Sequence, residues 1–447
     1  MTEEKKPGSI RIAGARVIDP AAGIDETADL LLENGTIWGI VPAGSEAPCA
    51  GSETTVIDGT GLAAAPGLID VHSHFRDPGL NYKEDIVTGA AAAAAGGYTT
   101  VVCMANTRPP VDSPEVCADL VRRMRDLPIH VRTMANVTVG MQGKELTDMA
   151  ALKAAGAVGF TDDGIPILDE KLLMQAFRRA KELGLPVSLH EEDPAFIWMA
   201  GVNAGETAER LGLGGASALA ENVLTARDAL LARETGCRVD IQHVSSAVTV
   251  RLIRFFKDLG ADLWAEVTPQ HLSLTEEAVP RRGAMAKVNP PLRTEADRQA
   301  LIEGLSDGTI YMIATDHAPH AAYEKARGIL KAPSGMIGLE TALALCITNL
   351  VRTGRMTLPE VLGKLTAAPA SFLKISDHAG SLAPGLPADV VLFDPAEAWT
   401  VEASDFHSKS SNSPFLGETL TGRVRMTIAG GRIVYSRAME GRITPAG

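Results

Sequence analysis

The segment GLIDVHSHF (residues 67–75) begins as an apolar run and ends in two histidines. Seven more short apolar runs follow it, and most of them also end in polar, chemically capable side chains. The eight runs are GLIDVHSHF (67–75), YTTVVCMAN (98–106), IHVRTMANV (129–137), AVGFTDDG (157–164), PVSLHEE (186–192), VDIQHVS (239–245), DLWAEVTPQ (262–270) and YMIATDHAP (311–319). Stretches with apolar residues three and four apart, such as 170–184 and 247–260, separate the runs and predict helices.

Repeated strand and helix units of this kind predict an α/β protein. A doubly wound sheet shows the same alternation as a (β/α)8 TIM barrel, so periodicity alone leaves both folds open. The polar run ends favour the barrel, because the active sites of such barrels lie at the carboxyl ends of the strands. We therefore expect a metal-dependent catalytic (β/α)8 barrel over residues 66–379.

The two end segments of the chain show a different pattern. Short alternating strands joined by Gly and Asn-Gly turns fill residues 9–65, and similar segments return at 388–395 and 424–436. We expect residues 1–65 and 380–447 to form one small β-sandwich domain beside the barrel.

Composition excludes several classes of protein. Hydrophobic residues make up 45% and charged residues 22%, as in ordinary globular domains. A net charge of -13 disfavours nucleic acid and anionic membranes as partners. Five scattered cysteines, including Cys49, argue against a disulfide framework and a thiolate zinc site. The N-terminal residues contain no apolar leader and no run of 18 apolar residues follows, so we expect a cytoplasmic protein.

Four histidines indicate a metal site. His72 and His74 are two residues apart in one expected strand, so both imidazoles point to the same side, into the barrel. His190 and His243 end the fifth and sixth runs. Any one of them has an ordinary structural explanation, but four that converge on one rim favour a site for Zn²⁺ or a similar divalent ion.

Carboxylates end two further runs. Asp316, at the end of the eighth run, would lie against the metal and its water. Asp162 and Asp163 end the fourth run, and adjacent strand residues point to opposite faces, so one of the two can enter the site directly. A solvated turn or a helix cap before Gly164 is the alternative for this pair.

Together these residues make the chain similar to the amidohydrolase superfamily and, more narrowly, to bacterial type I dihydroorotases. The motifs are DVHSHFRDPG (70–79), GGYTTVVCMANTRP (96–109), GFTDDG (159–164), EVTPQHL (266–272), KVNPPLR (287–293) and IATDHAPH (313–320). The resemblance extends over nearly the whole chain. Gln270 departs from the pattern, because relatives often have His there, and we expect only a local packing change.

The resemblance implies two divalent metal ions per chain, most readily Zn²⁺, and a bridging hydroxide as nucleophile. One metal would be surrounded by His72, His74, Asp163 and Asp316, and the second by Asp163, His190 and His243. Related cyclic amidases bridge their metals with a carboxylated Lys on the fourth strand, but AVGFTDDG contains no Lys. The resemblance to type I dihydroorotases instead implies that Asp163 bridges the metals, that Asp162 is supporting or structural, and that Asp316 carries the proton.

The resemblance also implies a set of substrate contacts. Dihydroorotate carries a carboxylate outside its reacting ring, and Arg76 is the expected cation for it. The remaining expected contacts are His74, Asn106, Asn289, His320 and the backbone around Ser334 and Gly335. Residues 321–335 are either a loop that closes over the substrate or a plain surface connection.

The predicted function is the reversible cyclisation of N-carbamoyl-L-aspartate to (S)-dihydroorotate and water in pyrimidine biosynthesis. One alternative is another cyclic amidase, a hydantoinase or an allantoinase, whose substrate need not carry that carboxylate. A second alternative is a non-catalytic partner of aspartate transcarbamoylase, which we would expect to have lost metal ligands. Homodimer formation and association of an active chain with aspartate transcarbamoylase both stay open.

Overall fold

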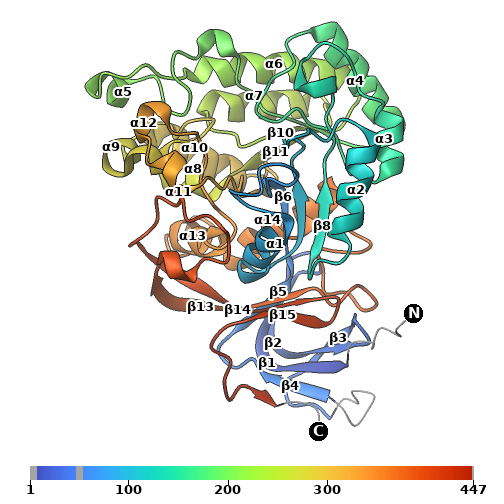
Figure 1. The fold of residues 1–447 in the computed structure, drawn as a ribbon. Helices are drawn as coiled ribbons and strands as arrows, with labels where there is room; N and C mark the ends of the chain where they lie inside the picture. The colour runs from blue at the N-terminus through green and yellow to red at the C-terminus, as the bar shows by residue number, and fades with distance from the viewer. Residues whose placement is uncertain (1–7, 47–53, 445–447) are drawn as a thin grey trace.

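The computed structural model describes residues 8–46 and 54–444, and Cys49 and the N-terminal residues 1–7 lie outside this part. A barrel of parallel strands surrounded by helices lies against a mixed sheet built from both end segments of the chain (Figure 1). This is the α/β architecture that the strand and helix pattern predicts.

The barrel consists of two parallel sheets joined by single bridges. The strands are β6 (Leu68–Ser73), β7 (Tyr98–Cys103), β8 (His130–Thr133), β9 (Val187–Leu189), β10 (Val239–Ile241), β11 (Leu263–Val267) and β12 (Met312–Ile313). Phe160 bridges Ala135 on one side and Val187 on the other, and a bridge between Ser73 and His317 closes the ring.

The fourth predicted run contributes only Phe160 to this ring instead of a strand. Beyond it, the Asp162 carboxylate accepts hydrogen bonds from the backbone N–H groups of Val137 and Thr138, at 2.9 and 3.2 Å. The N–H groups that follow strand β8 therefore bond to the Asp162 side chain and not to the backbone carbonyls of a longer fourth strand.

Helices follow the strands and bury their apolar faces against them. Their bounds are α1 (Ile86–Ala95), α2 (Pro114–Met124), α3 (Met149–Ala155), α4 (Glu170–Leu183), α5 (Glu206–Arg210), α6 (Ala218–Thr235), α7 (Ala247–Asp258), α8 (Pro269–Ser273), α9 (Ala278–Arg282), α10 (Glu295–Ser306), α11 (Ala322–Lys325), α12 (Gly328–Lys331), α13 (Ala342–Cys346), α14 (Leu358–Leu365) and α15 (Ala367–Phe372). Asp169 caps the N-terminus of α4, and Gly184 ends it with a φ of 70°, a conformation that favours glycine.

The main core lies between strands and helices. Val101 and Cys103 of β7 belong to it, whereas Val102 belongs to a second cluster with Val71 and Met312. Alternate positions of one strand thus pack in different apolar clusters, so both faces of the short barrel strands are buried.

The second part of the molecule is a mixed sheet of nine strands. It contains β1 (Ser9–Asp19), β2 (Ile24–Glu33), β3 (Thr36–Pro42), β4 (Thr54–Asp58), β5 (Ala63–Pro66), β13 (Val390–Thr400), β14 (Thr419–Ala429), β15 (Arg432–Ser436) and β16 (Ile443–Thr444). β5 lies between β1 and β13, so the N- and C-terminal segments pair directly. The next strand along the chain after β5 is β6, the first strand of the barrel.

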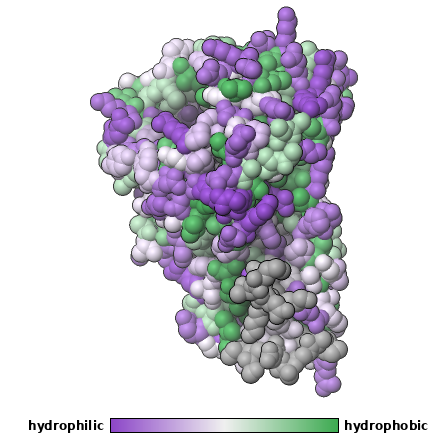
Figure 2. Space-filling view, turned by 45° about the vertical axis from the view of Figure 1, so that its right-hand side comes forward, coloured by the Kyte–Doolittle hydropathy of each residue, from purple (hydrophilic) through white to green (hydrophobic). Residues whose placement is uncertain are grey.

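The surface and the cysteines agree with a globular domain. Hydrophilic and apolar residues are interspersed on the face shown in Figure 2. Among the described residues, no helix has the length and apolar character needed to cross a membrane. Cys103, Cys117, Cys237 and Cys346 are buried free thiols.

Candidate active site

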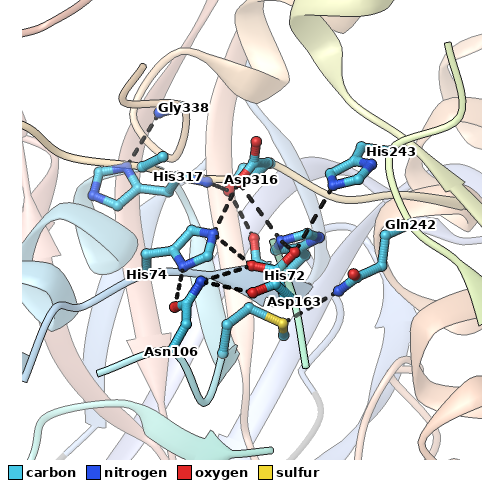
Figure 3. Close-up of polar contacts among 12 residues, drawn as sticks. His72, His74, Asn106, Asp163, Gln242, His243, Asp316, His317 and Gly338 are labelled. Carbon is cyan, nitrogen blue, oxygen red and sulfur yellow. Dashed lines mark hydrogen bonds and ion pairs between the residues drawn. The ribbon is translucent and has the colours of Figure 1, made fainter. Parts of the chain in front are cut away.

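The predicted metal ligands meet at the carboxyl ends of the barrel strands. Figure 3 shows five of them, namely His72, His74, Asp163, His243 and Asp316. His72 lies in β6, where the pairing with β7 shifts register between Asp70 and Ser73. β6 ends at Ser73, so His74 lies just beyond the strand. Both imidazoles face the Asp163 carboxylate, with His72 Nε2 at 3.7 Å and His74 Nε2 at 3.5 Å from its oxygens.

Two groups of ligand atoms share Asp163. One group is His72, His74 and Asp163, and the other is Asp163, His190 and His243, each with its ligand atoms within 4.8 Å of one another. Asp316 joins the first group, because its Oδ1 lies 3.0 Å from His74 Nε2 and 3.6 Å from His72 Nε2. The structure thus brings together all six residues that the sequence predicts as ligands.

In three of these histidines, one ring nitrogen donates a hydrogen bond to a side-chain oxygen. His72 Nδ1 donates to Glu266 at 2.5 Å, His74 Nδ1 donates to Asn106 at 3.0 Å, and His190 Nε2 donates to Glu192 at 2.8 Å. His72 Nε2 is fully buried and has no hydrogen-bond partner. The other nitrogen of each ring, Nε2 of His72 and His74 and Nδ1 of His190, therefore lies toward Asp163, which is the arrangement found around metal-bound histidines.

Opposite charges dominate the electrostatics of the site. Burial disfavours protonation of His72, but the carboxylates of Glu266 and Asp163 raise its pKa well above the ordinary value. Burial also opposes ionisation of Asp163, yet the surrounding histidines lower its pKa well below the usual range. Burial and the neighbouring His190 lower the pKa of His243. An anionic carboxylate among imidazoles is the donor set that a divalent cation requires.

Asp162 has a structural role. Besides the two backbone N–H groups, its carboxylate accepts a hydrogen bond from the Thr138 hydroxyl, and Asn136 Nδ2 donates to it at 3.3 Å. Asp163 is the acid of the pair that faces the histidines, as predicted for the bridging residue.

A cavity of about 190 Å³ opens over the ligands. It is lined by His74, Arg76, Asn106, Asp163, Gly164, His190, His243, Asn289, Asp316, Ala318, His320, Ser334 and Gly335. Every residue that the sequence predicts as a substrate contact is therefore in its wall.

Arg76 reaches this wall from the turn that follows strand β6. It does not extend strand β6 but has a φ of 58°, in the left-handed region. Its Nε donates to the carbonyl of Pro319 at 3.3 Å. Burial lowers the pKa of this guanidinium, whereas Asp316 and Asp163 act to raise it.

Comparisons with known proteins agree with this geometry. Residues 61–248 match the family described as "Dihydro-orotase-like". The chain is 50% identical over 427 residues to a dihydroorotase of Clostridioides difficile, covering 96% of this chain and 100% of that protein. It is 48% identical over 425 residues to one of Streptococcus pneumoniae, covering 95% and 99%.

The chain belongs to the dihydroorotase family. Solved structures of other cyclic amidases share its fold. An L-hydantoinase (dihydropyrimidinase) from Arthrobacter aurescens superposes with a TM-score of 0.84 at 27% identity, covering 96% of each chain. A dihydropyrimidinase from Brevibacillus agri gives a TM-score of 0.82 at 23% identity, covering 96% of this chain and 95% of that one.

Some site residues of this dihydroorotase family member escape sequence reasoning. Glu266 lies in the motif EVTPQHL, but nothing in the motif shows that it holds His72, which is 194 positions away. Lys83 is also unpredicted, and its Nζ lies 3.2 Å from His320 Nδ1 and 3.1 Å from Glu324. The polar end of the fifth run is a local signal for Glu192, whereas Glu266 lies inside strand β11 and has no such signal.

Proposed function

We propose that this chain catalyses the reversible cyclisation of N-carbamoyl-L-aspartate to (S)-dihydroorotate and water. The observation that carries the proposal is the presence of the Arg76 guanidinium in the cavity that also contains the two ligand groups. A metal site alone supports hydrolysis of a cyclic amide, and the half-buried cation of Arg76 adds recognition of an anionic ring substrate. The dihydroorotase relatives support the same substrate.

The donor set fits two divalent ions, with zinc the best match to imidazole and carboxylate ligands. His72, His74, Asp163 and Asp316 would hold one ion, and Asp163, His190 and His243 the other. When bound, the two ions would lower the pKa of a water molecule and polarise the ring carbonyl.

The residues of the chain would then position the substrate and move one proton. Arg76 binds the carboxylate that lies outside the ring, which orients the amide bond over Asp163. In ring opening, Asp316 accepts the proton released as water adds to the carbonyl carbon. It delivers this proton to the ring nitrogen as the carbon–nitrogen bond breaks, and ring closure follows the same path in reverse.

Substitution of Arg76 separates this function from that of a hydantoinase or an allantoinase. We expect Arg76→Ala to lose about 2 kcal/mol of charged hydrogen bonding, or roughly 30-fold in kcat/KM for dihydroorotate. Turnover of hydantoin or dihydrouracil, which lack the carboxylate, should not fall with it. Unchanged turnover of dihydroorotate by this variant would contradict the assignment.

A non-catalytic partner of aspartate transcarbamoylase is the weaker alternative, because all six ligand residues are in place. Homodimer formation and association with aspartate transcarbamoylase stay predictions, which sizing of the chain alone and mixed with that enzyme tests. We place the reaction in the cytoplasm, which the scattered cysteines support.

A further inference from the structure

The segment 328–335 ends in Ser334 and Gly335, which line the cavity, and it has an unusual set of hydrogen bonds. Lys287 Nζ donates to the carbonyls of Ile329 and Ala332, at 2.9 and 3.0 Å. Lys325 Nζ donates to the carbonyls of Pro333 and Gly335, at 3.0 and 2.9 Å. Two ammonium groups thus bind four carbonyls of a single short segment.

Further contacts complete the attachment of this segment. His320 Nε2 donates to the Ser334 carbonyl at 2.7 Å, and the Gly335 N–H donates to the Lys287 carbonyl at 2.8 Å. Asn412 Nδ2 donates to the Gly335 carbonyl at 3.1 Å. Two distant residues, Lys287 and Asn412, and two nearer ones, His320 and Lys325, therefore fix the backbone of this segment.

The ammonium groups of Lys325 and Lys287 are buried, so they bind these carbonyls in place of water. Lys325 is 3% exposed and Lys287 is 6% exposed. Glu324, the acid next to Lys325 in the sequence, forms its ion pair with Lys83 instead. Burial, with a smaller effect of Lys287, lowers the pKa of Lys325 to about 7. Burying an ammonium group is costly, so the carbonyl contacts must offset much of this penalty.

Gly335 shows how little freedom the segment has. Its φ is 127°, and a Cβ at this position would lie 2.8 Å from the Ala318 side chain and 3.0 Å from His320 Nε2. The backbone therefore has to keep close to both residues.

We propose that Lys325 and Lys287 are positioning residues, which clamp the backbone of Ser334 and Gly335 in the shape that the substrate ring needs. This inference rests on the proposed function, because that function places the ring against this backbone. The clamp acts on binding and not on proton transfer, so it should affect KM far more than kcat.

The test compares Lys325→Met and Lys287→Met with Lys331→Met. Methionine keeps most of the apolar stem and removes the donor, and Lys331 is an exposed lysine in the same segment. For each buried variant we expect KM for dihydroorotate to rise about 10-fold, as for the loss of about 1.4 kcal/mol of binding, and kcat to stay within about 2-fold. Amide hydrogen exchange over residues 332–336 should become faster, while metal content and Lys331→Met should match the wild type.

Faster exchange in a buried variant with an unchanged KM would overturn the proposal, because the clamp would then be only structural. Unchanged exchange would overturn it as well. If one variant fails to fold, the other carries the same test. A wild-type protein that is inert on dihydroorotate would instead refute the proposed function.

Discussion

At the scale of single residues, the site depends on which nitrogen of each histidine is free. Glu266 holds His72 Nδ1, and Asn106 holds His74 Nδ1, so Nε2 of each ring faces Asp163. Glu192 acts in the same way on His190 from the other side. These acceptors fix the ring orientation and the tautomer before any metal binds.

Glu266→Gln tests whether the Glu266 carboxylate prepares His72 for metal binding. The amide keeps the size of the side chain but removes the negative charge beside His72, so we expect metal affinity to fall by about 10- to 100-fold. Competition with a chelator measures the affinity. Glu303→Gln, an exposed change in α10, serves as the control, and equal affinities of the two variants would show that Glu266 has no such role.

At the scale of elements, helix α1 packs against the segment that follows β6 and contains His74. Asp85 caps this helix by accepting from the N–H groups of Val87 and Thr88. Gly89 of the same helix packs on Phe75, the residue after His74, so closely that a Cβ would lie 2.5 Å from the ring. The helix can approach the site because this position has no side chain.

Two glycine substitutions separate packing from helix propensity. Gly89→Ala should lower the melting temperature, because displacement of the buried Phe75 ring costs about 1–3 kcal/mol. Gly363→Ala in α14 should raise it, since the new Cβ meets only Pro20 at 3.4 Å and helix propensity gains about 0.5–1 kcal/mol. Calorimetry of both variants checks the opposite signs, and an equal shift of both would refute the packing argument.

The sequence predicts the elements and the side chains that cluster at the barrel rim where the signal is local. His190, His243 and Asp316 could be placed because each lies within three residues of the end of a short buried strand. The left-handed turn at Arg76 and the reduction of the fourth strand to Phe160 depend on tertiary contacts, and their positions in the sequence do not show them. The same is true of Glu266 and Lys325, whose partners are a distant imidazole and backbone carbonyls.

At the scale of the whole molecule, contacts between barrel and sheet hold the two parts together. The Gly67 N–H donates to the Asp389 carbonyl at 2.9 Å, and Thr427 Oγ1 donates to Ala94 at 2.7 Å. His130, at the start of β8, lies 3.1 Å from the Asp389 carboxylate. The hydrogen bond with Asp389 raises the pKa of His130.

This pair makes the stability of the molecule depend on pH. Because the folded-state pKa of His130 is raised, its contribution is fully present below the unfolded value of about 6.5. It is lost as the pH rises through the folded-state pKa. The difference in melting temperature between wild type and His130→Gln should therefore be larger at pH 5.5 than at pH 9. His378→Gln at an exposed site is the control, and a pH-independent difference for His130→Gln would argue against the pair.

The most direct test of the central claim is metal content measured together with ring opening of dihydroorotate, for the wild type and Asp163→Ala. We predict about two divalent ions per chain and activity in the wild type, with both reduced in Asp163→Ala and unchanged in the exposed control Asp377→Ala. A wild-type protein that is replete with metal yet inert on dihydroorotate would contradict the account.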